Sequence, residues 1–135
     1  MNNIAKNIVQ SFYNTDLLNT PEAFSEYLHP DFELHWNSSF GFSKKNFDDI
    51  KSMFLGMSNS FESFRCKISH LLSENDIVTI RFTYFAATIE RPEKEEALAH
   101  FIAIWELKDN KLYKGYQISQ HGDNTSENLA SFISI

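Results

Sequence analysis

The residues of this chain that could do acid–base or metal chemistry are few and widely spaced. Only one cysteine, Cys66, is present, so the sequence offers no intrachain disulfide and no cysteine-based metal site. No two histidines have the HxH or HxxxH spacing that brings two imidazoles to one metal ion. We therefore expect no metal ion, and a neutral histidine is the natural candidate for a general base near neutral pH. The histidines are His29, His35, His70, His100 and His121.

Arg81 is the other residue whose type is unusual for its place. It interrupts a β-type run, Ile77–Glu90, of otherwise mainly apolar and hydroxyl-bearing residues. A guanidinium there could hold a ligand carboxylate through a bidentate pair. The alternative is an ion pair with an acid of the fold itself, such as Glu33 or Glu106. The sequence contains no phosphate-binding glycine loop, nucleophile elbow or dinucleotide fingerprint, so no cofactor is expected.

Length and composition are typical of one globular domain, which we place at residues 1–135. The apolar fraction is 42% and the formal net charge is −6. Because binding to nucleic-acid phosphates depends on clustered Lys and Arg, we do not expect nucleic acid as a partner. No apolar run approaches the roughly 20 residues that span a bilayer, and the N-terminus has no leader pattern. The expected location is the cytoplasm, without a membrane partner.

The first half of the chain predicts three helices. Apolar residues at i and i+4 indicate a helix over residues 2–15. A Thr-Pro-Glu sequence at 20–22 is typical of a helix start, and the proline at position 30 ends that short helix by His29. A third helix is expected after Ser43 as its N-cap, because apolar residues then follow the i, i+3, i+4 rule. These residues are Phe47, Ile50, Phe54, Met57 and Phe61.

Strands are predicted by alternation and by long β-type runs. Asp31–Asn37 alternates, with Phe32, Leu34 and Trp36 facing one way. Four longer runs follow, joined by tight turns that make consecutive runs antiparallel. Neither face of Ile77–Glu90 is purely polar, so we expect helices to cover one face and a second copy of the protein to cover the other. The four runs are Cys66–Leu72, Ile77–Glu90, Ala97–Leu107 and Leu112–His121.

Two glycines stand inside predicted elements. Gly56 in the third helix costs about 1 kcal/mol relative to alanine, so we expect either fraying or a close packing contact there. Gly115 in the last strand indicates a bulge or a close approach of the backbone. A short C-terminal helix is predicted within Asn124–Ile135. Its apolar side carries Leu129, Phe132 and Ile133.

The relative placement of Arg81 and His100 depends on the register of one hairpin. The two side chains share a face of the sheet if the residue numbers of each cross-strand pair add up to an odd number. A two-residue loop at Arg91-Pro92 would give this register. A three-residue loop places them on opposite faces, because a slip of one residue reverses every side chain. The sequence leaves both registers open.

Five stretches of the chain carry a family resemblance. They are SFY at the end of the first helix, YLHPDFELHW, FGFSKKNFDDIKSMF, ENDIVTIRFTYFAA and AHFIAIWELKDNKLYKGYQI. Together they resemble the nuclear transport factor 2-like superfamily, and within it the SnoaL-like group, over about residues 3–123. The resemblance implies an α+β fold in which a cone-shaped, curved antiparallel sheet wraps three helices. It also implies a pocket between the helices and the concave face, and a homodimer.

The resemblance also bears on individual residues. His100 stands where several relatives carry a pocket histidine, which would be a general base; the alternative is a structural histidine with a backbone partner. Tyr13 stands where steroid-isomerase relatives carry a tyrosine, and either it or Arg81 could stabilise developing oxyanion charge. Gln120 stands where cyclase-like and hydrolase-like relatives carry an aspartate, and a glutamine cannot take a proton at pH 7. Thr83 replaces an acid that accompanies the arginine in epoxide-hydrolase relatives.

Three functions follow from these expectations. The first is a small-molecule-binding protein with an apolar pocket, which the glutamine at position 120 favours. The second is a cofactor-independent isomerase, cyclase or lyase on a small apolar, ring-bearing substrate, with His100 as base and Arg81 or Tyr13 stabilising the oxyanion. The third is a homodimeric interaction module without activity. The residues expected to contact a ligand are Tyr13, His35, Trp36, Phe40, Phe54, Arg81, Thr83, His100, Ile102, Tyr116 and Gln120.

Overall fold

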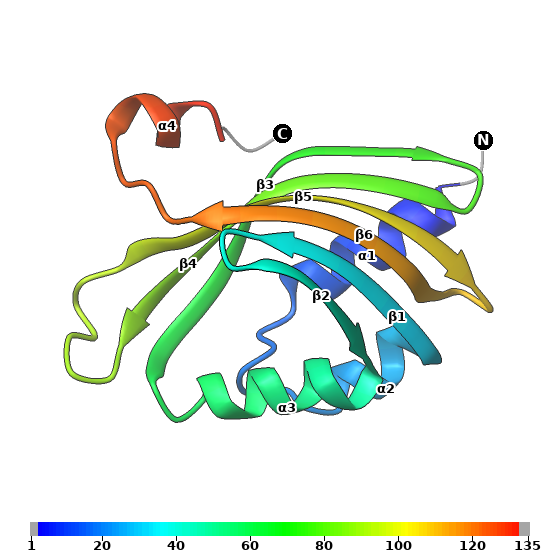
Figure 1. The fold of residues 1–135 in the computed structure, drawn as a ribbon, viewed down its shortest axis with the longest axis horizontal. Coiled ribbons are helices and arrows are strands. Elements are labelled where there is room, and N and C mark those ends of the chain that lie inside the picture. The colour runs from blue at the N-terminus through cyan, green and yellow to red at the C-terminus, as the bar shows by residue number, and fades with distance from the viewer. Residues whose placement is uncertain (1–2, 133–135) are drawn as a thin grey trace.

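The computed structural model describes residues 3–132 and contains one six-stranded sheet (Figure 1). Its strands are β1 (Leu28–Ser38), β2 (Gly41–Asn46), β3 (Phe61–Glu74), β4 (Ile77–Thr88), β5 (Glu96–Lys108) and β6 (Lys111–His121). They lie in the order β2-β1-β6-β5-β4-β3. The four later strands pair antiparallel, as predicted, whereas β1 runs parallel to β6 and antiparallel to β2.

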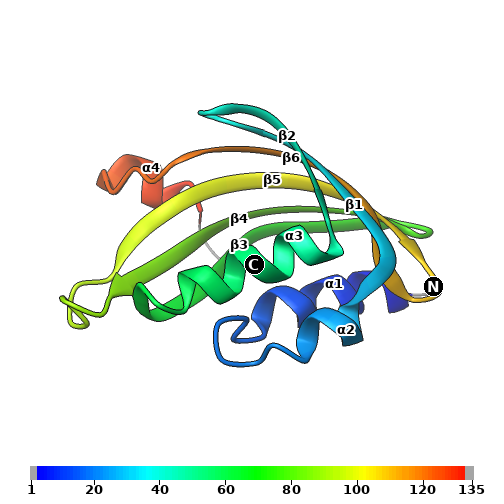
Figure 2. The same cartoon turned by 60° about the horizontal axis from the view of Figure 1, so that its bottom comes forward.

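The predicted fold class is confirmed: the sheet curves over helices without closing into a barrel (Figure 2). The helices on its concave side are α1 (Ile4–Asn14), α2 (Ala23–Tyr27) and α3 (Phe47–Met57). A fourth helix, α4 (Ser126–Ala130), is the predicted C-terminal helix and follows the last strand; Ile133 lies outside the described residues. Within residues 3–132, no helix has the length and apolar character needed to cross a membrane.

The core lies between the concave face and the helices and consists mainly of aromatic rings. Phe82 of β4 stacks on Phe101 of β5, with ring centroids 4.9 Å apart and 8° between the ring planes. Tyr13 of α1 packs on Phe82 with centroids 4.5 Å apart. Burying each such side chain contributes roughly 1.5–3 kcal/mol, so the apolar stripe of α1 holds this helix on the sheet.

The element boundaries differ most from the sequence expectation between Gly41 and Phe61. Gly41–Asn46 forms β2, the hairpin partner of β1, instead of a loop and a helix start. The N-cap of α3 is Asn46, not Ser43: the Asn46 side chain accepts from the Asp49 N–H, and the Asp49 carboxylate accepts from the Asn46 N–H. This reciprocal cap satisfies two backbone donors at once and places the helix start after the strand. Phe61, expected in that helix, begins β3.

Gly115 is the point where β6 meets the Trp105 ring. A Cβ at Gly115 would overlap that ring, so the predicted close approach is confirmed. Trp105 is itself buried, and its indole N–H donates to the Tyr13 hydroxyl at 2.8 Å. Gly56 has open space where a Cβ would stand, and α3 ends one residue later at Met57. The close packing contact considered for Gly56 is therefore wrong.

Replacing Gly115 by alanine is expected to lower the free energy of unfolding by about 1–3 kcal/mol, because the added methyl overpacks the buried Trp105 ring. Chemical denaturation measures this change. Gly56→Ala is the matched control and should keep stability or raise it by at most about 1 kcal/mol. A Gly115→Ala protein as stable as the wild type would contradict this description of the packing.

Candidate functional site

A cavity of about 260 Å³ lies between the concave face of the sheet and helices α1 and α3. Its volume is close to the lower end of ordinary small-molecule sites, roughly 300–1,000 Å³. The wall is almost wholly apolar and rich in aromatic rings. Tyr13 comes from α1, Phe54 from α3, and Trp36, Phe101 and Trp105 from the sheet. Such a wall suits a flat, apolar ring system.

The polar side chains that line this apolar cavity include Gln117 and two tyrosines. Gln117 of β6 is only 7% exposed, and its amide forms no side-chain hydrogen bond with any described residue. The Tyr84 hydroxyl also has no hydrogen-bond partner among residues 3–132, and the Tyr13 hydroxyl accepts from Trp105. Burial raises the pKa of both tyrosines, so their hydroxyls stay protonated and can donate. A carbonyl or hydroxyl group on a bound molecule would complete these hydrogen bonds.

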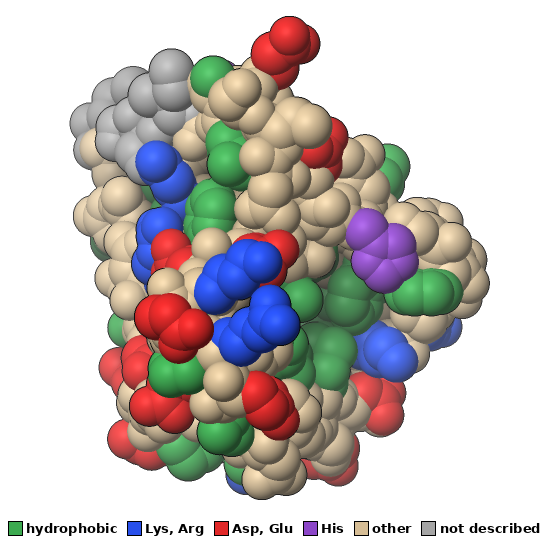
Figure 3. Space-filling model, turned by 90° about the vertical axis from the view of Figure 1, so that its left-hand side faces the viewer, with side chains coloured by type: hydrophobic (Ala, Val, Ile, Leu, Met, Phe, Trp, Pro, Cys, Tyr) green, Lys and Arg blue, Asp and Glu red, His purple; other side chains and the backbone are tan. Residues whose placement is uncertain are grey.

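The open end of the cavity meets a second, more polar recess of about 300 Å³, which we call the rim recess. Trp36 and His121 line both spaces, whereas Lys45 lines only the rim recess. The Trp36 indole N–H donates to Ser119 Oγ at 2.8 Å, which fixes that ring between the two. Figure 3 looks onto one end of the molecule, where hydrophobic side chains lie at the bottom of a hollow and basic and histidine side chains stand at its edge.

The structure divides the predicted ligand-contacting residues into three groups. Tyr13, Trp36 and Phe54 line the cavity. Phe40 and Gln120 line the rim recess. The remaining residues lie on or just beneath the convex face, outside the cavity wall. They are His35, Arg81, Thr83, His100, Ile102 and Tyr116.

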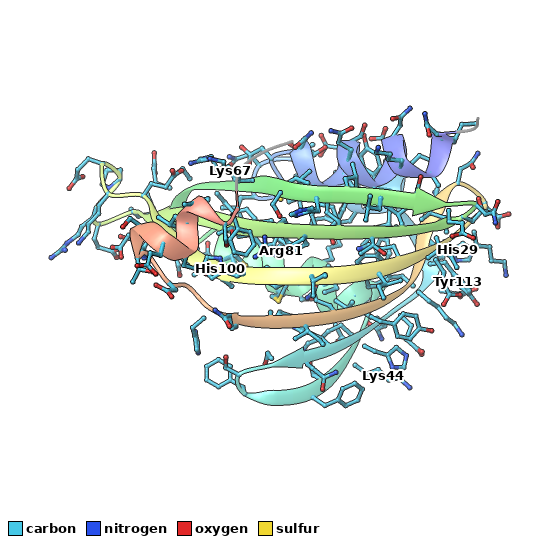
Figure 4. All side chains as sticks on the ribbon, turned by 90° about the horizontal axis from the view of Figure 1, so that it is seen from above. His29, Lys44, Lys67, Arg81, His100 and Tyr113 are labelled. Carbon is cyan, nitrogen blue, oxygen red and sulfur yellow. The ribbon has the colours of Figure 1, made fainter. Side chains whose placement is uncertain are left out.

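Arg81 and His100 share a face of the sheet, and it is the convex one. The register pairs Arg81 with Ile102 and Thr83 with His100, the odd-sum arrangement. Phe82 and Phe101 point into the core, so their neighbours in sequence point away from it. Figure 4 shows Arg81 and His100 beside α4. The expectation that these two residues line the cone is therefore corrected.

His100 has the geometry of a neutral, structural histidine. Its Nε2 accepts from the Asp123 backbone N–H at 2.9 Å and from the Asn128 side-chain amide at 3.0 Å. The ring proton therefore lies on Nδ1, which donates to Thr83 Oγ1 at 2.8 Å. Burial lowers the pKa of His100, and the positive charge of Arg81 acts in the same direction, while Asp123 opposes them.

Arg81 holds the C-terminal segment on the sheet and pairs with neither Glu33 nor Glu106. Its Nη1 donates to the Ser131 carbonyl at 2.9 Å, and its guanidinium lies 3.7 Å from the centroid of the Phe132 ring. Phe132 also stacks on His100 with centroids 4.9 Å apart. The charge is thus used for a cation–π contact and backbone hydrogen bonding inside the fold.

The residues at the site that were not among the predicted ligand-contacting residues include Tyr84, Gln117, Lys45 and His121. The sequence pattern of β6 explains why Gln117 was not predicted. Its large apolar residues, Tyr116 and Ile118, are 41% and 62% exposed, whereas Gln117 is buried. Because alternation normally directs apolar side chains inward, the sequence pointed to Tyr116 instead. The only sequence signal was a polar residue, Gln117, between two large apolar ones. It indicated that the apolar residues of this strand face outward.

Comparisons with known proteins identify the fold. A family model described as SnoaL-like domain matches residues 9–114, which confirms the resemblance. A search of curated proteins finds no match. AusH from Aspergillus nidulans has a TM-score of 0.73 at 12% identity, covering 100% of this chain and 93% of its own.

Two further solved structures are similar at low identity. An LEH-like epoxide hydrolase from M. tuberculosis has a TM-score of 0.67 at 14% identity, covering 96% of this chain and 89% of its own. IdmH from Streptomyces antibioticus, named as a candidate polyketide cyclase, has a TM-score of 0.66 at 14% identity, covering 94% and 96%. At these identities the likeness shows the fold alone.

Acidification is expected to weaken the packing of the C-terminal segment. The lowered pKa of His100 means that the unfolded chain binds a proton more readily than the folded one. The free energy of unfolding should therefore decline as pH falls below about 6.5, the ordinary histidine value, and level off below the folded-state value. Thermal denaturation of the wild type and His100→Asn across pH 5–8 measures this.

The control for that measurement is the pH dependence of the free energy of unfolding that remains in the His100→Asn variant. Asp123 has a lowered pKa because it accepts hydrogen bonds from Thr125, so its own contribution is lost in a more acidic window. Identical slopes between pH 5 and 7 in the two proteins would show that His100 does not carry the effect.

Proposed function

The chain belongs to the SnoaL-like domain family, and from that premise we propose that it binds a small, mainly apolar, ring-bearing molecule inside the cone. The observation that carries this proposal is the apolar cavity with the Gln117 amide facing it and free of any described partner. Among the described residues no fully buried side-chain polar atom lacks a partner, so the Gln117 amide is open to the cavity, and a hydrogen bond with a bound carbonyl or hydroxyl would contribute about 0.5–1.5 kcal/mol. Burying the ring of that molecule adds about 25 cal/mol per Å² of apolar surface.

Binding is favoured over a cofactor-independent isomerase, cyclase or lyase. Among the described residues that line the cavity there is no Asp or Glu. His100, the expected base, is on the convex face with both ring nitrogens already hydrogen-bonded. Tyr13 could stabilise an oxyanion, but proton abstraction would fall to His121 at the rim alone. Neutral hydrogen-bonding groups hold a ligand more readily than they move its protons.

Filling the mouth of the cavity should weaken binding. N-phenyl-1-naphthylamine, an uncharged dye that fluoresces in apolar sites, is expected to bind the wild type with increased emission. Ala99 lines both the cavity and the rim recess, so Ala99→Phe should weaken dye binding at least tenfold by occupying the shared space. A fluorescence titration measures both affinities.

Ala99→Ser is the matched control, since it changes the same position without filling space. It should bind the dye like the wild type, and both variants should keep the wild-type circular dichroism spectrum. Equal dye binding by Ala99→Phe and the wild type would place the dye elsewhere and contradict the proposed site.

We also propose that two copies associate through the convex face. Ile102 pairs with Ile118 and Ile104 with Tyr116 across β5 and β6, so these four side chains form one patch. Each is 41–62% exposed. A contiguous apolar patch of this kind is typical of an interaction surface, and a twofold dimer buries the same patch on both partners.

A charge in the patch should prevent this association. Ile118→Asp is expected to sediment as a monomer under conditions in which the wild type sediments as a dimer, because the carboxylate would be buried unpaired. Leu55→Asp on α3, whose leucine is 48% exposed outside the patch, is the control and should remain dimeric. A monomeric wild type at every concentration tested would contradict the dimer without affecting the proposed cavity.

A further inference from the structure

We propose that the ligand is an elongated carboxylate with a second polar group at its far end. Its acid group would lie at Lys45 in the rim recess, and its carbonyl or hydroxyl would reach the Gln117 amide in the cavity. This inference rests on the proposed function and adds the chemical class and the orientation of the bound molecule.

Lys45 is a cation without a described counter-ion. It is half-buried in the rim recess and forms no ion pair with any residue of the described range 3–132. Its neighbour Lys44 lies on the other side of β2, with its Nζ 3.7 Å from the Glu33 carboxylate. In a chain of net charge −6, an unpaired ammonium at the mouth of an apolar cavity is an unusual feature, and a carboxylate from the ligand would pair with it.

The register shows why the two lysines differ. Lys45 is paired with Leu34 and Lys44 with His35. Leu34 points into the cone and lines the cavity, whereas His35 is on the convex face, stacked on Tyr116. Alternation therefore turns one lysine toward the cavity mouth and its neighbour toward the outer surface. The chain thus supplies its own matched pair for an experiment.

His121 connects the rim to the interior. Its ring lines both the cavity and the rim recess, and it makes an edge contact with Phe40, with centroids 4.8 Å apart. It has no hydrogen bond with any described residue, so it can form one with a polar group of a ligand that reaches the open end of the cavity. Through Leu34, Lys45 is level with Gly115, six residues before His121 on β6, so the two residues line different parts of the rim recess.

The distance between the two polar ends sets the length of the ligand. Lys45 is two strands across the sheet from Gln117 and two residues along it, which corresponds to about 12 Å at roughly 4.8 Å per strand and 3.3 Å per residue. The wall between them includes Leu34 and Trp36 of β1, the strand between β2 and β6. An apolar ring body with one group at each end fits this order of polar rim, apolar middle and amide floor.

Three related probes test the inference: 6-hydroxy-2-naphthoic acid, its methyl ester and 2-naphthoic acid. The hydroxy acid should bind the wild type best. Lys45→Met should weaken its binding about tenfold, the size expected for losing one charge-assisted hydrogen bond, and should leave binding of the ester within twofold. Lys44→Met should leave all three affinities within twofold. Gln117→Leu should remove the advantage of the hydroxy acid over 2-naphthoic acid.

The outcomes separate this inference from the proposed function. Equal binding of the acid and the ester, or equal effects of Lys45→Met and Lys44→Met, would overturn the anionic rim. Failure of the hydroxy acid to bind while N-phenyl-1-naphthylamine still binds would overturn it as well and would leave the apolar cavity in place. Failure of the dye together with all three probes would count against the proposed function itself, as would equal dye binding by Ala99→Phe and the wild type.

Discussion

The position of Trp105 is the constraint on which the cavity depends. Its indole N–H donates to the Tyr13 hydroxyl at 2.8 Å, its ring lies against Gly115, and it stacks on Phe32 with centroids 5.5 Å apart. Moving α1 away from the sheet would leave two buried polar groups unpaired, and moving it closer would compress close-packed rings. The distance between α1 and the sheet is thus set at this point, and the hollow beyond it follows from that separation.

Alternation along the curved strands gives the two faces of the sheet different roles. The concave positions of β5 carry Phe101 and Trp105, which form cavity wall and core. The convex positions carry His100, which anchors the C-terminal segment, and Ile102, which belongs to the exposed patch. One strand therefore serves ligand binding, attachment of α4 and an outer surface at once, because adjacent side chains point in opposite directions.

Much of the fold could be predicted because several elements are strongly patterned. The stripe on α1 and the Phe32-Leu34-Trp36 alternation of β1 identified core-facing residues, whereas Tyr13 was named as a site residue from the family resemblance; Tyr13 and Trp36 both line the cavity. β2 was missed because its glycine, serine and two lysines have weak strand preference, and pairing with β1 supplies what local preference lacks.

The placement of Arg81 and His100 could not be predicted for a different reason. Both faces of β4 and β5 are apolar, so the alternation of side chains along each strand does not show which face meets the helices. Burial of polar residues added to the ambiguity: Thr83 and His100 are almost fully buried on the convex side, under α4 and Phe132. A short C-terminal helix docking on the outer face converts what would be exposed positions into interior ones.

The distribution of charge within the site follows from the cost of desolvation. Groups deep in the cavity, such as Gln117 and Tyr84, are neutral, so they can face an apolar space without the several kcal/mol penalty of burying an ion. The cation, Lys45, stands at the rim, where water still reaches it before a ligand arrives. A bound molecule with the same distribution would keep its own charge at the rim and bury only neutral groups. The arrangement therefore selects for orientation: a molecule inserted the other way would bury its charge and leave both the amide and the ammonium unpaired.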